Sequence, residues 1–255
     1  MTMARPDDFH LLRERVVLAG TLTTRTALHI GGGAGELEAV DLPVVKTHAG
    51  LPFIPGSSLK GVVRSTVESL LRAAEIQGLS ACDPFDDAKA CGSPRNPGAS
   101  MDSHCAVCRL FGSYGVASHV RFSDAHLDHP GGPSPLEKRD GVAIDRDLRV
   151  AADKRKYDVE VVAPGTTFAL EILAQNLEPW QLGLLLAGLD PIEQGFTALG
   201  GFTSRGLGRV EIQWKALTRS TAKQMLCGLS VEAPDLGATF DAWRAALAAK
   251  TEEKG

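Results

Sequence analysis

The sequence predicts an α+β fold with a ferredoxin-like core, the element order that is also found in RNA-recognition-motif domains. Runs of β-branched residues and two segments with helical spacing read as strand, helix, strand and then strand, helix, strand. The chain has 255 residues, of which 44% are hydrophobic and 23% charged, and this is ordinary for a globular protein with a large core. Because no internal repeat is visible, we expect residues 1–255 to form a single domain.

The first strand and the first helix are predicted from the first 75 residues. Residues 15–30 partly alternate and are rich in Val, Leu and Thr, which is typical of a strand. Pro55-Gly56 predicts a turn, and Ser57 or Ser58 suits the N-cap of a helix that ends near residue 75. Apolar residues recur in this helix at a spacing that places them on one face: Leu59, Val62, Val63, Val67, Leu70 and Leu71.

The rest of the core is predicted to contain four short strands and a second helix. The helix covers residues 179–189, which are compact and apolar. A C-terminal helical extension follows the core over residues 219–255, with its main helix at 237–249. The predicted strands are residues 120–122, 159–162, 167–174 and 209–214.

Residues 129–157 are predicted to form a polar β-hairpin that projects from the core. The segment opens with His-Pro-Gly-Gly-Pro and then carries a dense mixture of acidic and basic side chains. Its basic residues suit contacts with phosphates, although a solvated charged loop explains the same composition. These residues are Arg139, Arg146, Arg149, Lys154, Arg155 and Lys156.

Four of the five cysteines predict a zinc-binding insertion at residues 79–112. This segment is poor in large apolar residues, so it would be a long structureless loop unless a metal ion supplied folding energy. Its last two cysteines form a C-x-x-C pair, which can grip one ion. Packing of small cysteines in a core is the simpler alternative. The four are Cys82, Cys91, Cys105 and Cys108.

The predicted zinc site is structural, because four protein ligands leave no position for a reactive water. His104 is a fifth possible ligand and the natural substitute if one cysteine is not used. The H-x-E sequence of the zinc deaminases does not precede the C-x-x-C pair, which excludes that class of enzyme. Cys227 lies apart and is expected to be buried.

The first turns of the first helix are predicted to bind phosphate. Free backbone N–H groups and the helix dipole favour an anion there. Ser57, Ser58, Lys60 and Arg64 add donors, and the two basic residues, four apart, share a face of the helix. An ordinary helix with solvated basic residues is the alternative.

A glycine-rich loop at residues 199–209 is the second predicted phosphate-binding element. Its glycines allow a close backbone approach, while Thr203, Ser204 and Arg205 offer donors. A β-hairpin turn is the alternative. Neither element matches a nucleotide-binding fingerprint, because the chain contains no G-x-x-x-x-G-K-[ST].

Charge and hydropathy narrow the class of partner. The formal net charge of −4 argues against a general nucleic-acid coat protein, but it leaves room for a local basic patch. The N-terminus lacks the apolar core of a signal peptide, and no uncharged apolar run reaches the ~18 residues of a membrane span. We therefore expect a cytoplasmic protein without a membrane partner, in which the cysteines are reduced.

Three segments together resemble the RAMP superfamily of CRISPR-associated proteins. They are residues 51–61 (LPFIPGSSLKG), residues 105–112 (CAVCRLFG) and residues 199–209 (LGGFTSRGLGR). Within that superfamily the chain is most similar to the subunits that line the guide RNA in type III effector complexes. The resemblance implies that the first helix and the glycine-rich loop lie against the guide RNA. It also implies that the polar hairpin is a thumb that enters between guide and target bases.

The resemblance also implies the partners and a candidate catalytic residue. The partners are guide RNA, complementary target RNA, other effector subunits and, as one option, further copies of this chain. Family members that cut RNA carry an aspartate in the loop after the first strand, and Asp41 in Val40-Asp-Leu-Pro-Val matches it. Its carboxylate could position Mg²⁺ or a similar divalent ion, or help to deprotonate the attacking 2′-OH. Glu36 and Glu38 are weaker candidates in the same loop.

Three functions remain open at this point. The first is a ribonuclease subunit that cuts target RNA through Asp41 and leaves a 2′,3′-cyclic phosphate. The second is an inactive RNA-binding subunit of the same complex, in which Asp41 only caps a turn. The third is a zinc-stabilised adaptor that binds proteins. The resemblance alone does not make the chain an enzyme, because several members of the superfamily do not cut RNA.

Overall fold

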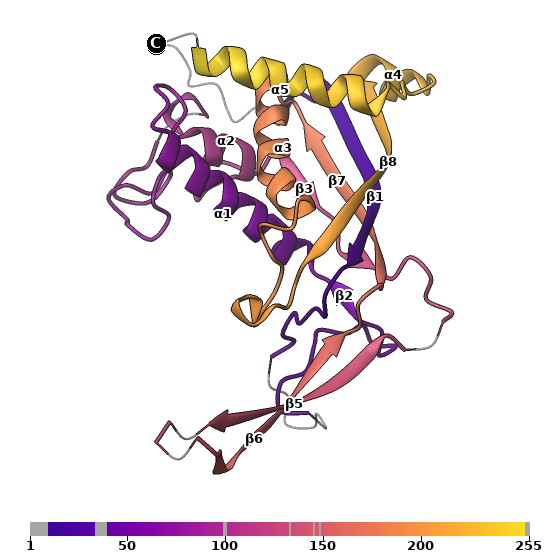
Figure 1. The fold of residues 1–255 in the computed structure, drawn as a ribbon. Coiled ribbons are helices and arrows are strands. Elements are labelled where there is room, and N and C mark those ends of the chain that lie inside the picture. The colour runs from indigo at the N-terminus through magenta and orange to yellow at the C-terminus, as the bar shows by residue number, and fades with distance from the viewer. Residues whose placement is uncertain are drawn as a thin grey trace.

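The structure, a computed structural model, confirms a mixed α and β fold with antiparallel sheets. One four-stranded sheet carries helices on one face, and a separate two-stranded hairpin projects beyond its end (Figure 1). Glu36, Glu38 and Asp145 lie outside the residues that the structure describes, and nothing is described of the side chains of residues 151–154. The described residues are 10–33, 40–98, 101–132, 134–144, 146–147 and 149–252.

The main sheet has the strand order β3-β7-β1-β8. The central strand β1 pairs antiparallel with both β7 and β8, and β3 pairs antiparallel with β7. Along the chain, α1 lies between β1 and β3, and α3 lies between β7 and β8. The bounds are β1 Glu14–Thr24, β3 Val120–Phe122, β7 Thr167–Gln175 and β8 Val210–Thr221.

The alternating pattern of β7 explains why only one face of the sheet is covered. Phe168, Leu170 and Ile172 are buried, whereas Ala169 and Glu171 between them are exposed. Successive side chains of a strand point to opposite faces, so the apolar set lies under the helices. The sequence pattern therefore determines which face the helices cover.

The first strand is shorter than its sequence predicts. It ends at Thr24, whose hydroxyl donates to the carbonyl oxygen of Ala163 over 2.8 Å. The following residues leave the sheet, and Leu28 instead pairs with Val162 at the base of the hairpin. The predicted strand over residues 15–30 is thus wrong after residue 24, because the chain turns toward a second partner there.

Helix α1 (Gly56–Ala74) packs its predicted apolar stripe against the core. Leu59, Val63 and Val67 are buried, but Leu70 is largely exposed, contrary to its place in the predicted stripe. The predicted serine N-cap is also wrong, because the N-cap is Pro55, two or three residues earlier, and it has no side-chain cap hydrogen bond. Instead the backbone N–H of Gly56 donates to Oδ1 of Asp124 over 2.8 Å.

Helices α3 (Pro179–Glu193) and α5 (Leu236–Glu252) pack together, and both extend beyond the ends that the sequence predicts. Phe240 and Trp243 of α5 are buried in this contact. The short helix α4 (Ala222–Cys227) precedes α5, and β8 occupies the start of the predicted helical extension. Cys227 is exposed, so its predicted burial is wrong.

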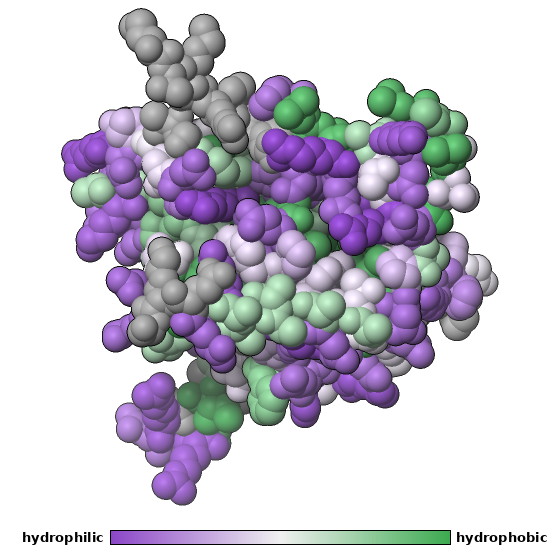
Figure 2. All heavy atoms as spheres, turned by 90° about the horizontal axis from the view of Figure 1, so that it is seen from above, coloured by the Kyte–Doolittle hydropathy of each residue, from purple (hydrophilic) through white to green (hydrophobic). Residues whose placement is uncertain are grey.

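The surface around α5 is mostly hydrophilic. Figure 2 looks onto this face and shows hydrophobic side chains gathered at the right-hand edge, in the region of α4. The exposed apolar residues of α4 and the loop after it are Leu226, Leu229 and Val231. No helix in the described part of the chain combines the length and the apolarity needed to cross a membrane.

The hairpin consists of β5 (Leu136–Ile144) and β6 (Ala151–Val162), which pair antiparallel. Residues 159–162 form a strand as predicted, but they continue β6 and so belong to the hairpin, which the sequence predicts only at residues 129–157. Figure 1 shows the hairpin extending away from the main sheet. The short strands β2 (Phe53–Ile54) and β4 (Ala125–His126) pair with each other to form a third, two-stranded sheet.

Candidate functional site

The four cysteines of the predicted insertion converge on one point. Their sulfur atoms all lie within 4.8 Å of one another, and those of Cys82 and Cys108 are 3.5 Å apart. A tetrahedral zinc ion with Zn–S bonds of about 2.3 Å requires sulfur atoms about 3.8 Å apart. The arrangement therefore fits one tetrahedral ion with little adjustment.

The local backbone is folded to support negative sulfur atoms. Helix α2 (Ala106–Phe111) starts at Cys105, whose Sγ accepts N–H bonds from Cys108 and Cys82 at 3.4 Å each. The N–H of Cys105 in turn donates to Sγ of Cys91 over 3.4 Å. A 3-10 turn, η2 (Met101–Ser103), precedes this helix. Thiolates are the form that binds zinc, so these donors prepare the site for a metal.

The thiols of the cluster differ in acidity. Hydrogen bonding from the Cys108 thiol, helped by the backbone donors, lowers the pKa of Cys105 to about 4. Burial is the main reason that the pKa of Cys91 is raised to about 11. The hydrogen bond with Cys105 raises the pKa of Cys108. Binding of a divalent ion would displace the protons that remain, as it does in structural zinc sites.

His104 does not belong to the cluster of sulfur atoms. Among the described residues, the metal-binding group consists of the four cysteines alone. The His104 side chain is buried and faces two glycines, since a Cβ at Gly115 would lie 3.3 Å from its Nε2. The geometry favours Cys₄ over a set in which this histidine replaces a cysteine.

Arg64 connects α1 to the cysteine cluster. Its Nη2 lies 3.6 Å from Sγ of Cys108, and its Nη1 donates to the carbonyl oxygen of Gly112 over 3.1 Å. Its Nε donates to Glu68 over 2.8 Å. Burial alone would lower the pKa of Arg64, but Glu68 and the nearby Cys108 raise it. The sequence analysis missed this ion pair within α1, although the i, i+4 spacing of Arg64 and Glu68 could have indicated it.

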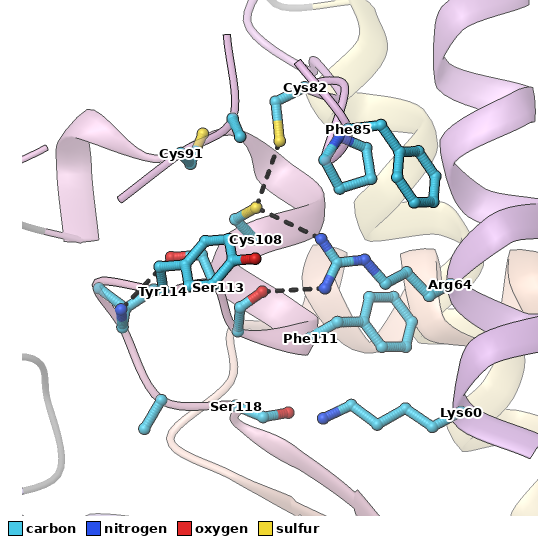
Figure 3. Close-up of a pocket in the computed structure, with 15 residues that line it drawn as sticks. Lys60, Arg64, Cys82, Phe85, Cys91, Cys108, Phe111, Ser113, Tyr114 and Ser118 are labelled. Carbon is cyan, nitrogen blue, oxygen red and sulfur yellow. Dashed lines mark hydrogen bonds between the residues drawn. The ribbon is translucent and has the colours of Figure 1, made fainter. Parts of the chain in front are cut away.

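Lys60 lies on the same face of α1 but in a different environment. Its amino group points across a cavity toward Ser118 and has no hydrogen-bond or ion-pair partner among the described residues (Figure 3). Burial, and then the charge of Arg64, lower its pKa. At the start of the helix, Ser57 is exposed and Ser58 is half-buried. Of the two basic residues predicted to bind phosphate on this helix, Arg64 is paired with Glu68, whereas Lys60 has no negatively charged partner among the described residues.

The glycine-rich loop is shaped by close packing against residues 27–30. A Cβ at Gly200 would lie 2.2 Å from the carbonyl oxygen of His29, and one at Gly208 would lie 2.1 Å from that of Leu199. Both glycines also have positive φ. The fold of the loop thus requires glycine at both positions, because a side chain has no room at either of them.

The predicted donors of this loop are exposed. Thr203, Ser204 and Arg205 form a short 3-10 turn, η3 (Thr203–Arg205), that faces solvent. The guanidinium of Arg205 lies over the ring of Phe202 and donates from Nη1 to the hydroxyl of Tyr157 over 2.6 Å. Because Tyr157 belongs to β6, this contact joins the glycine-rich loop to the hairpin.

Asp41 is exposed and attached to the base of the same hairpin. Its Oδ2 accepts the backbone N–H of Asp158 over 2.9 Å, and the next residue, Leu42, pairs with Val159 of β6. The carboxylate of Asp158 forms an ion pair with Lys138 of β5 at 2.5 Å. The sequence reasoning missed Lys138 and Asp158, because only the pairing of β5 with β6 brings them to Asp41.

Arg146 and Arg149 are exposed in the loop between β5 and β6. Asp158 lies seven positions after Ala151, which is at this end of β6, and this corresponds to about 23 Å of extended chain. The predicted site residues therefore form three groups. The cysteines lie with Lys60 and Arg64 beside α1, Asp41 and Arg205 lie at the hairpin base, and Arg146 and Arg149 lie at the hairpin tip.

Comparison with known proteins gives this fold a family. The model of the RAMP superfamily matches residues 21–211, so the chain belongs to that superfamily. This stretch contains α1, the hairpin, the glycine-rich loop and residues 79–112, which carry the four clustered cysteines and are called the cysteine segment below.

Three curated relatives share the name "CRISPR system Cms endoribonuclease Csm3". The protein from Methanocaldococcus jannaschii is 27% identical over 215 residues, which cover 79% of this chain and 80% of the relative. The protein from Enterococcus italicus is 29% identical over 205 residues, covering 77% and 88%. The protein from Mycobacterium tuberculosis is 29% identical over 223 residues, covering 77% and 86%.

Proposed function

We propose that this protein is a guide-RNA-binding backbone subunit of a type III CRISPR effector complex and cuts complementary target RNA through Asp41. Relatives named as CRISPR endoribonucleases support the proposal, and they align with about four fifths of the chain. The observation that carries it is the position of Asp41, which is exposed yet held by a backbone N–H of β6.

The geometry of Asp41 suits a catalytic carboxylate. One of its oxygens accepts the Asp158 N–H, and the described residues offer no hydrogen bond to the other. The carboxylate is therefore oriented by one oxygen and available through the second, which could accept the proton of a 2′-OH. In that reaction the 2′-oxygen bonds to phosphorus as the bond from phosphorus to the 5′-oxygen breaks, and this leaves a 2′,3′-cyclic phosphate.

In the alternative role, the same oxygen would hold a divalent ion. Carboxylate oxygens are the ligands that Mg²⁺ prefers, and Asp41 would hold the ion with its free oxygen. Bound there, the ion would supply charge stabilisation to the reacting phosphate. Lys138 pairs with the carboxylate of Asp158, whose backbone N–H binds Asp41, and adds a positive charge at the hairpin base.

The guide RNA would be held by the exposed donors on α1 and the glycine-rich loop. Lys60 lacks an anion, and the side chains of the η3 turn face solvent. The hairpin would act as the thumb, with Arg146 and Arg149 at its tip against nucleic acid. The order β3-β7-β1-β8 supports a ferredoxin-like core, because it places the first strand between the third and the fourth strands of a βαββαβ unit.

The cysteine cluster would hold one structural Zn²⁺. The convergence of four sulfur atoms and the N–H donors around Cys105 support this assignment. In the cytoplasm, where thiols stay reduced, the free cysteines would be available to a metal ion. In a complex of this kind the remaining partners would be other effector subunits or further copies of this chain.

One observation also favours the inactive structural subunit. The hydrogen bond from Asp158 to Asp41 ties the loop to the hairpin, and this is what a structural aspartate would do. A protein-binding adaptor without RNA is the third alternative, and co-purified RNA would exclude it.

Two substitutions separate the catalytic role of Asp41 from the structural one. Asp41→Asn keeps an oxygen for the Asp158 N–H but removes the negative charge, whereas Asp41→Ala removes both. In the assembled complex, with a divalent ion, we expect both variants to bind guide and target RNA normally and to lose cutting of RNA. Complementary DNA should remain uncut even with the unmodified protein, because it lacks the 2′-OH.

The products are measured by electrophoresis, and the cyclic phosphate is identified by its resistance to ligation. Cutting by Asp41→Asn at the unmodified rate would show that the hydrogen bond is the only role of this side chain. The inactive structural reading would then replace the catalytic one.

A further inference from the structure

A cavity of about 600 Å³ lies beside the cysteine cluster, between α1, the cysteine segment and the loop after α2 (Figure 3). Its volume is within the range of small-molecule sites. None of the residues that line it is acidic. The cysteines close one end, and Lys60 extends into the other.

The two ends of the cavity differ in charge. Arg64 sits between them and directs its guanidinium to Cys108 and Gly112, so it offsets the charge of the thiolates. Lys60 has no such partner among the described residues, although burial makes an uncompensated ammonium unfavourable. An anion at the Lys60 end would remove that cost.

Two aromatic side chains at the cavity are almost fully exposed. Phe85 of the cysteine segment is 96% exposed, and Tyr114 of the loop after α2 is 81% exposed. Both line the cavity, and Phe111 lies deeper in its wall. Exposed rings beside a cation are typical of surfaces that bind single-stranded nucleic acid, in which bases stack on the rings and the backbone contacts basic residues.

We propose that this cavity takes one nucleotide of single-stranded RNA, with a phosphate at Lys60 and the base against Phe85 and Tyr114. The inference rests on the proposed RNA-binding function and adds a site to it. The hydroxyls of Ser113 and Ser118, which also line the cavity, are already bonded to backbone groups. Ser118 donates its proton to the carbonyl oxygen of Val120, whereas Ser113 accepts two backbone N–H groups and keeps only its own proton to donate. One hydroxyl donor cannot distinguish the four bases, so the site should bind different bases with similar affinity.

The RNA reading is favoured over an acidic peptide because the cavity offers stacking surfaces and a single uncompensated cation. A peptide would need partners for its backbone N–H groups. Of the polar groups that line the cavity, Ser113 and the Gly112 carbonyl already hold protein partners.

The test compares aromatic variants of the full-length, metal-loaded chain. The probe is a uridine oligonucleotide of about 12 residues with one 2-aminopurine, whose fluorescence falls when it stacks on an aromatic ring. Phe85→Ala with Tyr114→Ala should weaken binding about tenfold and abolish the quenching. Its salt dependence should stay unchanged, because stacking releases no counterions. Both rings are exposed, so their loss should leave the fold intact, and zinc content and circular dichroism check this.

Two further variants serve as controls. Phe196→Ala removes an aromatic ring that is 83% exposed but distant in sequence from the cavity-lining residues, and it should change nothing. Lys60→Met should lower the salt slope of binding by about 0.7, the value for one phosphate contact with a single strand.

The outcomes separate this inference from the function on which it rests. Normal affinity and normal quenching in the double aromatic variant, with weakened binding in Lys60→Met and Arg205→Ala, would overturn the cavity site and leave the RNA-binding function in place. No binding of the probe by the unmodified chain would overturn both. Retained RNA binding with loss of another effector subunit in the double variant would assign the cavity to a protein partner and overturn the proposal.

Discussion

The cysteine end and the hairpin end of this protein use charged residues in opposite ways. At the cysteine end, Arg64 is half-buried and binds Glu68, a backbone carbonyl and a cysteine sulfur. At the hairpin base, Lys138 and Arg205 are exposed: Lys138 pairs with Asp158, and Arg205 contacts the ring of Phe202 and the hydroxyl of Tyr157. Positive residues near a predicted RNA surface thus divide into those that hold the fold and those that remain accessible.

This difference has a thermodynamic origin. Most of the segment between Leu79 and helix α2 lacks large buried side chains, and it is tied together by the cysteine cluster and by Arg64. A metal ion bound at the four sulfur atoms would add folding free energy there. The hairpin obtains its stability from backbone pairing along β5 and β6, which does not depend on side-chain charge. Its charged side chains form exposed ion pairs, such as Lys138 with Asp158 and Lys156 with Asp140, which solvent weakens and a ligand could replace.

The largest expected effect follows from removing a cysteine. Cys105→Ser should lose most of the bound zinc and destabilise the protein by at least about 4 kcal/mol, because structural metal binding is part of the folding free energy. Hydrogen exchange should rise across residues 79–112 and stay unchanged in β5 and β6. Metal analysis and exchange mass spectrometry measure the two quantities.

Cys227→Ser is the matched control, since this cysteine is exposed and apart from the cluster. It should keep one zinc per chain and normal stability. Full stability of Cys105→Ser, or equal exchange at both ends of the molecule, would contradict the metal-dependent folding of the cysteine segment.

A smaller effect is expected at Arg64. Arg64→Ala leaves the buried carboxylate of Glu68 with only the longer 3.5 Å contact to Arg72 and removes a donor from Cys108. We expect a loss of about 2 kcal/mol in the free energy of unfolding, because a buried charge loses its main partner. Urea unfolding measures this loss, and Lys60→Ala on the same helix should cost much less.

Arg64→Lys sharpens the same comparison. A lysine cannot reproduce the three separate contacts of the guanidinium, so this variant should be only partly rescued. Normal stability of Arg64→Ala combined with weakened RNA binding would return Arg64 to the phosphate contacts that its sequence context predicts.

Features that depend on a pattern of neighbouring residues could be predicted from the sequence. The alternation in β7, the apolar stripe of α1 and the C-x-x-C pair each follow from neighbouring residues. The three motif segments predicted the RAMP superfamily, and the family match confirms it. The convergence of four cysteines could also be expected, because they lie within one segment poor in other core residues.

The remaining features depend on contacts between distant residues. Asp124 replaces the predicted serine cap because β3 ends next to the start of α1, and no local pattern records this approach. Asp41 meets Asp158 and Lys138 only through the pairing at the hairpin base. Cys227 was expected to be buried because cysteines usually are, but α4 leaves it in solvent.

The smallest expected effect is on the ion pair at the hairpin base. The Lys138 side chain is 51% exposed, so its pairing with Asp158 is weakened by solvent. Lys138→Ala should change the free energy of unfolding by no more than about 1 kcal/mol. The same variant should slow target cutting in the assembled complex, because it removes a positive charge from the hairpin base at which Asp41 lies. If Lys138→Ala instead unfolds the protein as readily as Arg64→Ala, the hairpin base is held by side-chain charge after all, and the contrast between the two ends fails.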